Sequence, residues 1–274
     1  MIAGLLVGLA IGFLILRARF RHRIASEIRA LLGASKDQVG PAELRSRWPD
    51  LPAPARRYLS YSIGDETPPL RTARVVHGGT FRLRPDAPWR PIRGRQHFSV
   101  AHPGFVWDAS VVMAPGIRIQ ARDALLGGRG SMLVKLGSVL TMANAGGADV
   151  DQGASLRWLA ESVWFPFAFV SEDVRWDAID EHRARVSLTG QASPVSAVLE
   201  IDPEGRIVGL RADRRRDLGG GRSALTVWTG VYGEYRSFGG FTVPTSVEAA
   251  WDLPEGPFTY ARFHVESIEY NVDR

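Results

Sequence analysis

Residues 224–253 read "ALTVWTGVYGEYRSFGGFTVPTSVEAAWDL" and predict two strands joined by a tight turn. Both halves follow the two-residue period of half-buried strands rather than the 3.6-residue period of a helix. The paired glycines in "FGGF" (238–241) supply the backbone freedom that a hairpin turn requires. A connection this short joins antiparallel neighbours, so the stretch predicts an antiparallel sheet.

The same period continues from about residue 70 to the C-terminus, punctuated by glycine and proline. In "ARVSLTG" (184–190), Ala184, Val186 and Leu188 share one face, which is typical of a sheet covered on one side. The segment "DPEG" (202–205) predicts another hairpin turn. Eleven or twelve such strands must curl or close. We therefore expect a mainly β protein: a large curled antiparallel meander, either a half-barrel or an open barrel, with one inserted helix.

The inserted helix is predicted over 154–165, within "ASLRWLAESVWFPFAF" (154–169), and Pro166 is expected to end it. Its apolar stripe consists of Leu156, Leu159, Ala160 and Val163. Arg157 and Glu161 are four residues apart and are therefore neighbours on its surface. Two interpretations remain open: a half-buried ion pair that docks the helix on the sheet, or an acid beside an aromatic wall that binds a polar head group or moves a proton.

The N-terminal run "MIAGLLVGLAIGFLIL" (1–16) contains no charged side chain. As a helix it spans roughly 24 Å, and extension to Phe20 approaches the roughly 30 Å of a bilayer core. This predicts a membrane anchor over 1–20; a cleaved signal peptide and a buried helix are the alternatives. The arginines that follow predict a bacterial inner-membrane protein with a cytoplasmic body, a periplasmic body being the alternative. The spacing of three glycines permits self-association of the anchor: Gly4, Gly8 and Gly12.

Residues 21–69 are expected to form a helical connector before the β domain at 70–274. Residues 20–33 carry an amphipathic stripe that consists of Ile24, Ile28, Leu31 and Leu32. A second helix is predicted between Pro54 and Gly64. Its buried face is expected to consist of Ala55, Tyr58, Leu59 and Ser62.

Composition excludes several classes of function. The chain has 274 residues and no cysteine, which excludes disulfides, thiol nucleophiles and cysteine-ligated metals. Of the net charge of +5, residues 1–33 carry +4 (five arginines, one glutamate), so the body carries +1. A nucleic-acid binder needs a basic folded surface, and none is expected here. No nucleotide-binding motif or local histidine pair is present, so we expect no cofactor and no metal site.

Five segments resemble a bacterial family of membrane-anchored domains of unknown function. They are "LPAPARRYL" (51–59), "PGFVWDA" (103–109), "RDALLGGRGSM" (122–132), "RWLAESVWFP" (157–166) and "VYGEYRSFGGFTVP" (231–244). The resemblance covers roughly 50–270 and implies an anchored domain without a known activity or catalytic residue. The expected curled sheet is also similar, at the level of fold, to lipoprotein-carrier half-barrels.

Two functions remain. The first is a membrane-anchored module that binds an apolar or amphipathic, lipid-like ligand, for which the lining candidates are Trp107, Trp164, Trp228 and Trp251. Polar ligand contacts are expected from Asp123, Arg157 and Glu161, with Asp123 placed at the end of a strand before "ALLGGRG". The alternative is an acid–base enzyme, a hydrolase or isomerase, that uses Asp123 and Glu161, with His264 as a further candidate.

Overall fold

The computed structural model describes residues 2–190 and 194–273, with side chains from Gly8 onward except that of Leu9. The α-helices are α1 (Ile2–Ala34), α2 (Pro41–Arg47), α3 (Ala53–Ser62) and α4 (Ala148–Glu161). Short 3₁₀ helices are η1 (Trp48–Asp50), η2 (Ser162–Trp164) and η3 (Pro166–Val170). The described strands are β1 (Thr72–Phe81), β2 (Arg90–Ser99), β3 (Gly104–Ala114), β4 (Ile117–Leu126), β5 (Arg129–Leu136), β6 (Leu140–Gly146), β7 (Val174–Ala178), β8 (Arg183–Leu188), β9 (Val195–Ile201), β10 (Ile207–Gly219), β11 (Arg222–Phe238), β12 (Phe241–Leu253) and β13 (Gly256–Tyr270).

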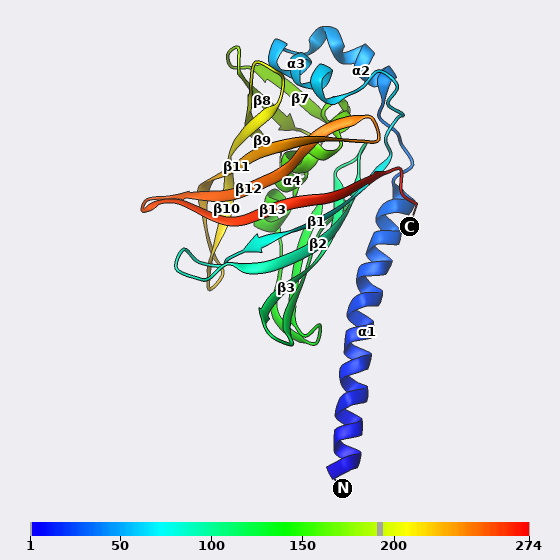
Figure 1. Cartoon of the computed structure of the whole chain (residues 1–274), viewed down its shortest axis with the longest axis vertical. Helices are drawn as coiled ribbons and strands as arrows, with labels where there is room; N and C mark the ends of the chain where they lie inside the picture. The colour runs from blue at the N-terminus through cyan, green and yellow to red at the C-terminus, as the bar shows by residue number, and fades with distance from the viewer. Residues whose placement is uncertain (1, 191–193, 274) are drawn as a thin grey trace.

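The thirteen described strands form one antiparallel sheet that curls without closing (Figure 1). Their order is β6-β5-β4-β3-β2-β1-β13-β12-β11-β10-β9-β8-β7, so only the β1–β13 pair joins strands that are distant in sequence. This confirms a curled antiparallel meander. The expected number of strands was one or two too low, because β6 was missed. Most of its side chains are exposed, so it lacks the alternation by which the other strands were recognised.

Both hairpin turns expected from the sequence are present. Gly239 and Gly240, between β11 and β12, adopt φ angles of 51° and 88°, where glycine is strongly preferred. At the β9–β10 turn, the amide of Gly205 donates to the carbonyl of Asp202 at 3.0 Å. The expected alternation also holds in β8, whose three inward side chains are fully buried: Ala184, Val186 and Leu188.

Helix α4 connects the two outer strands of the sheet, β6 and β7, and lies inside the curl (Figure 1). On one side the Asp151 carboxylate accepts a hydrogen bond from the amide of Gly130 in β5 at 2.6 Å. On the other side the Gln152 amide donates to the carbonyl of Asp213 and accepts from the amide of Arg215, both in β10. The helix therefore bridges the gap between the two arms of the sheet.

The helix bounds differ from the expected 154–165. The first turns of α4, "ADVDQG" (148–153), are polar and lack the apolar stripe, although Asp149 and Asp151 suit a helix N-terminus. At the other end, α4 stops at Glu161 and the chain tightens into η2. Pro166 does not end α4 but begins η3, because proline fits the first position of a helical turn.

The main core lies between the concave face of the sheet and the segment from α4 to η3. Trp158 is fully buried, and its indole nitrogen donates to the carbonyl of Ser99 in β2 at 3.0 Å. The hydroxyl of Tyr232 in β11 donates to the carbonyl of Ala160 at 3.0 Å. These bonds attach α4 to strands on both arms of the sheet. The segment after α4 adds three fully buried rings: Phe165, Phe167 and Phe169.

Helix α1 packs on the opposite, convex face. The structure joins the expected anchor and the following amphipathic helix into one continuous helix, and the expected stripe is the face that packs. A second, smaller core forms there from Phe20, Ile24, Leu31, Val106, Ala124 and Leu133, with Ile28 packed against it. The buried guanidinium of Arg122 donates to Glu27 at 2.6 Å. In α3 the four predicted positions are buried: Ala55, Tyr58, Leu59 and Ser62.

The expected anchor, residues 1–20, includes positions whose side chains the structure does not describe, namely 1–7 and Leu9. Among the residues whose side chains are described, no helix has both the length and the apolar character needed to cross a membrane. In α1, Gly8 and Gly12 have no neighbouring atom within 4 Å of an added Cβ, and Gly4 lies outside the residues with described side chains. Self-association through these glycines stays a prediction.

Candidate functional site

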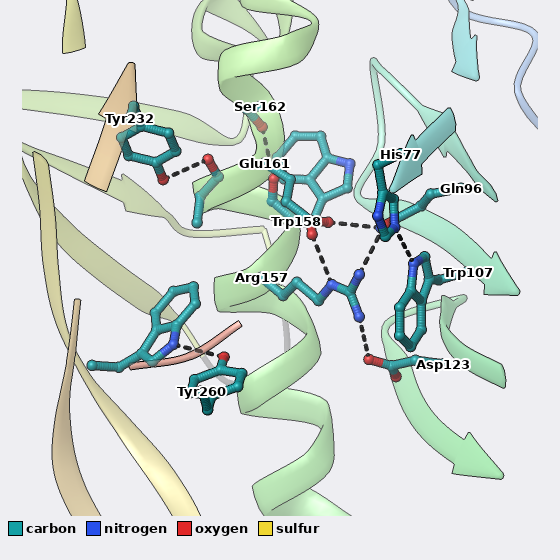
Figure 2. Close-up of polar contacts among 12 residues, drawn as sticks. His77, Gln96, Trp107, Asp123, Arg157, Trp158, Glu161, Ser162, Tyr232 and Tyr260 are labelled. Carbon is teal, nitrogen blue, oxygen red and sulfur yellow. Dashed lines mark hydrogen bonds and ion pairs between the residues drawn. The ribbon is translucent and has the colours of Figure 1, made fainter. Parts of the chain in front are cut away.

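Arg157, on the inward face of α4, forms the centre of a polar network inside the curl (Figure 2). Its guanidinium donates to Glu161 at 2.9 Å, to Asp123 at 2.8 Å and to the side-chain carbonyl of Gln96 at 2.8 Å. The Gln96 amide in turn donates to the second oxygen of Glu161 at 2.7 Å. The guanidinium also lies 4.7 Å from the ring centroid of Trp107, within the range of a cation–π contact.

The sheet register explains why these partners meet. Gln96 in β2 pairs with Trp107 in β3, and Trp107 pairs with Asp123 in β4. Residues directly opposite each other on neighbouring strands point to the same face, so these three side chains form one inward row. Arg157 reaches this row from the helix, and Glu161 follows one turn later on the same helix face.

The network holds two carboxylates against one guanidinium, all with side chains that are 13–15% exposed. Burial raises the pKa of the Glu161 carboxyl above its ordinary value, although Arg157 and Gln96 act against this shift. Burial lowers the pKa of Arg157, but Glu161 and Asp123 together outweigh it and raise that pKa. Arg157 therefore stays charged, and removing it would leave two largely buried carboxylates without their common cation.

His77 extends the network by one hydrogen bond. Its Nε2 accepts from the indole of Trp107 at 2.9 Å (Figure 2). Its ring centroid lies 4.5 Å from that of Phe263. Burial, followed by the nearby charge of Arg157, lowers the pKa of His77 to about 4. The imidazole is thus neutral at pH 7, so it acts here as a hydrogen-bond acceptor rather than as a cation.

A second group of side chains on β1, β11, β12 and β13 forms what we term the aromatic wall: Phe81, Trp228, Trp251, Phe258 and Tyr260. The Trp228 indole donates to the Tyr260 hydroxyl at 3.0 Å (Figure 2). The guanidinium of Arg214 lies 4.8 Å from the Trp228 ring and 5.8 Å from the Trp251 ring. Phe81, Trp251 and Tyr260 are only partly buried, so α4 does not cover the wall completely.

The structure thus divides the residues that the sequence singled out into three groups. Four of them meet in the Arg157 network: Trp107, Asp123, Arg157 and Glu161. Trp228 and Trp251 belong to the aromatic wall. Trp164 belongs to neither, since it is 2% exposed in the core and donates to the carbonyl of Pro244.

Two expected placements were wrong. Asp123 lies inside β4, which continues to Leu126, rather than at a strand end, and it accepts a hydrogen bond from Arg157. His264 does not join the carboxylates. It is 49% exposed and lies 3.7 Å from Glu234, whereas the preceding Phe263 is the residue that contacts His77. Successive side chains of a strand face opposite ways, so His264 points away from the concave side.

Sequence reasoning missed six residues that the structure places in or beside these groups: His77, Phe81, Gln96, Arg214, Phe258 and Tyr260. For Gln96 a signal was available, because in "RQHFSVA" (95–101) it is on the same face as Phe98. A polar residue on the buried face of a strand requires a partner. Arg214 and His77 carried no comparable signal, since their partners lie on distant strands.

Among the described residues, no three His, Asp or Glu side chains form a cluster suited to a metal ion. One open groove, of about 290 Å³, lies beside α2 and α3 next to Trp48 and Phe167. Another, of about 610 Å³, lies between the end of α1 and the β2–β3 and β4–β5 turns. Neither groove contains residues of the Arg157 network or the aromatic wall.

Comparison with solved structures finds chains that match over most of their length at low identity. A LolA superfamily protein from Nitrosomonas europaea matches with a TM-score of 0.43 and 13% identity, covering 80% of this chain and 94% of its own. A putative outer membrane lipoprotein-sorting protein domain from Vibrio parahaemolyticus gives 0.39 and 8%, covering 85% and 92%. A DUF1329 family protein from Desulfovibrio piger gives 0.44 and 10%, covering 81% and 92%.

No curated protein sequence matches this chain. A family model does match, and it covers most of the chain, from residue 44 to residue 263. This range contains the whole Arg157 network and the whole aromatic wall. The chain belongs to the family described as "Family of unknown function (DUF6544)".

Proposed function

We propose that this protein is a membrane-tethered module that binds an amphipathic, lipid-like ligand against the aromatic wall. The observation that carries the proposal is the incomplete cover of that wall: Phe81, Trp251 and Tyr260 stay partly exposed on the inner side of a curled sheet. Ligand sites are concave and mostly apolar, with a few placed polar groups. Arg214, over two tryptophans of the wall, is a cation for an anionic head group.

The tether is the apolar run at residues 1–16, followed by Arg17, Arg19, Arg21 and Arg23. Basic residues that flank a single span favour the cytoplasmic side, so we propose an inner-membrane protein with a cytoplasmic body. A phosphatase fused to the C-terminus, active only outside the cytoplasm, should then be inactive in cells. An active fusion would place the body in the periplasm and leave the binding proposal unaffected.

The geometry favours binding over acid–base catalysis. Glu161 uses one oxygen to accept from Arg157 and the other to accept from Gln96, and Asp123 is also bound to Arg157. These contacts are those of a structural ion-pair network. His264, the further acid–base candidate, faces Glu234 instead. We therefore assign the network to docking α4, and the aromatic wall to the ligand.

Native mass spectrometry of the full chain, purified in mild detergent, tests the binding proposal. We expect wild type to retain a lipid-sized ligand and Trp251→Ala to lose most of it. Trp48→Ala is the matched control, because Trp48 is also a partly buried tryptophan but lies in η1, beside the groove at α2. Ligand loss in Trp48→Ala with retention in Trp251→Ala would move the site to that groove. A wild-type protein that stays empty after incubation with lipid vesicles would contradict the proposal.

A further inference from the structure

Helix α1 extends past the end of the sheet in the same direction as the β3–β4 and β5–β6 hairpins (Figure 1). Where α1 packs on the sheet, the buried ring of Phe20 lies 5.6 Å from the Lys135 ammonium in β5. Further toward the N-terminus, Phe13 lies beside the β5–β6 turn, where a Cβ added to Gly137 would be 3.8 Å from its ring. Phe13 precedes Arg17 by about one helical turn, or roughly 6 Å.

The contact of Phe13 with the β5–β6 turn determines how deep the hairpins lie relative to the tether. If Arg17 and Arg19 lie at the lipid headgroups, as snorkelling arginines do, Phe13 lies just below them in the bilayer. The β5–β6 turn beside Phe13 must then reach the boundary between the headgroups and the acyl chains. A surface at that depth requires apolar side chains that insert and basic side chains that meet anionic lipid.

The hairpins have this composition. We define the rim as Ile117 and Arg118 at the β3–β4 turn together with Leu140 and Met142 in β6. Ile117 is 49% exposed, Leu140 60% and Met142 57%, so three large apolar side chains are exposed at one end of the molecule. Exposed apolar side chains grouped in this way mark a contact surface.

The charge around the rim is basic. The first acidic residue of the chain is Glu27, after four arginines, and Asp123 is the only acidic residue between positions 109 and 148. Asp123 points to the concave side and is bound to Arg157. The outer surface of α1 and these hairpins presents exposed Arg17, Arg19 and Arg118, and the exposed carboxylate of Asp108 in β3 lies near Arg21.

We propose that the rim rests in the headgroup region of an anionic lipid bilayer, so that the concave face opens onto the membrane from which its ligand comes. The inference rests on the proposed tether and names bilayer lipid as the ligand class. Met113 and Ile119 lie partly exposed on the concave face close to the rim, and they continue its apolar surface inward. The test below also detects the alternative in which the rim contacts a second copy of the chain instead of lipid.

The absence of cysteine makes the test direct, since one introduced cysteine is the only site for a thiol-reactive dye. Full-length Ile117→Cys and Ile179→Cys are labelled with an environment-sensitive fluorophore and reconstituted into vesicles that contain phosphatidylglycerol and a nitroxide-labelled lipid. Ile179 is the matched control: it is an isoleucine that is 43% exposed, in the β7–β8 turn. That turn lies beside α3, where Arg57 donates to the carbonyl of Glu181.

We expect the lipid nitroxide to quench the dye at position 117 and to leave the dye at position 179 bright. If the chain floats with vesicles but both dyes stay equally bright, the rim does not contact lipid and the inference fails, while tether and ligand site stand. The dye at position 117 could instead be quenched without any lipid nitroxide, to an extent that depends on protein concentration. In that case the rim is a contact between copies of the chain, and this result also overturns the inference. If the chain does not float with vesicles, tether and rim both fail, and native mass spectrometry of ligand retention still tests the wall separately.

Discussion

Arg157→Met should lower the free energy of unfolding by about 3–5 kcal/mol, because it leaves buried carboxylates without their cation. Asp123 and Glu161, with side chains 15% and 14% exposed, both lose their hydrogen bonds to the guanidinium. Methionine retains much of the volume in contact with Trp107, so the loss reports mainly on charge. Urea titration of the detergent-solubilised full chain, followed by circular dichroism, measures the effect.

A triple variant decides whether the loss comes from unpaired charge. Replacing Arg157 by Met, Asp123 by Asn and Glu161 by Gln removes all three charges, and we expect it to recover much of the stability lost in the single variant. The matched control is Arg211→Met, whose ion pair with Asp252 at 3.4 Å is 60% and 46% exposed. That change should cost about 0–1 kcal/mol. Strict additivity of the three single losses in the triple variant would contradict a coupled network.

Glu161→Gln alone separates docking from ligand binding. The amide keeps the size of the carboxylate and one acceptor for Arg157, but it cannot accept from both Arg157 and Gln96 as the carboxylate does. If the network docks α4, the melting temperature should fall. An unchanged melting temperature together with loss of the ligand would assign Glu161 to the ligand site.

Local signals were sufficient for the sheet but not for its edges. Hairpin turns such as "FGGF" and alternating strands such as 184–190 are decided within ten residues, and both are present in the structure. By contrast, β6 is an outer strand with exposed side chains, so burial imposes no alternation on it. The first turns of α4 were missed for a related reason: their contacts are polar bonds from Asp151 and Gln152 to distant strands.

Only the local contacts of the Arg157 network could be predicted from the sequence. Arg157 and Glu161 are neighbours by helical spacing alone, so their pairing follows from sequence. Asp123 and Gln96 reach them only because the registers of β2, β3 and β4 align both with Trp107. Register across a meander depends on bulges and turn lengths, such as the shift between Val112 and Ala114, and a single sequence does not specify it.

The second large effect is expected at Trp158, the fully buried tryptophan of α4. Trp158→Ala should lower the free energy of unfolding by about 3–5 kcal/mol, since it opens a cavity between the helix and the sheet. It also removes the hydrogen bond to the carbonyl of Ser99 and the contact with the Phe165 ring, 5.8 Å away. The same urea titration as for Arg157 provides the measurement.

Two further variants test whether the loss in Trp158→Ala comes from its position in the core. Trp158→Phe fills most of the cavity but removes the buried hydrogen bond to the Ser99 carbonyl, so it should cost about 1–3 kcal/mol. Trp251→Ala removes an equally large ring from the partly exposed aromatic wall, and it should reduce stability less than Trp158→Ala while losing the ligand. A large loss of stability in Trp158→Ala indicates that α4 is part of the core. A smaller loss of stability with loss of the ligand in Trp251→Ala indicates that the aromatic wall faces the ligand. A loss of less than about 1 kcal/mol in the free energy of unfolding is typical of a surface substitution. If Trp158→Ala caused only such a loss, α4 would not be part of the folded core. The interior it fills would then be available to the ligand as well.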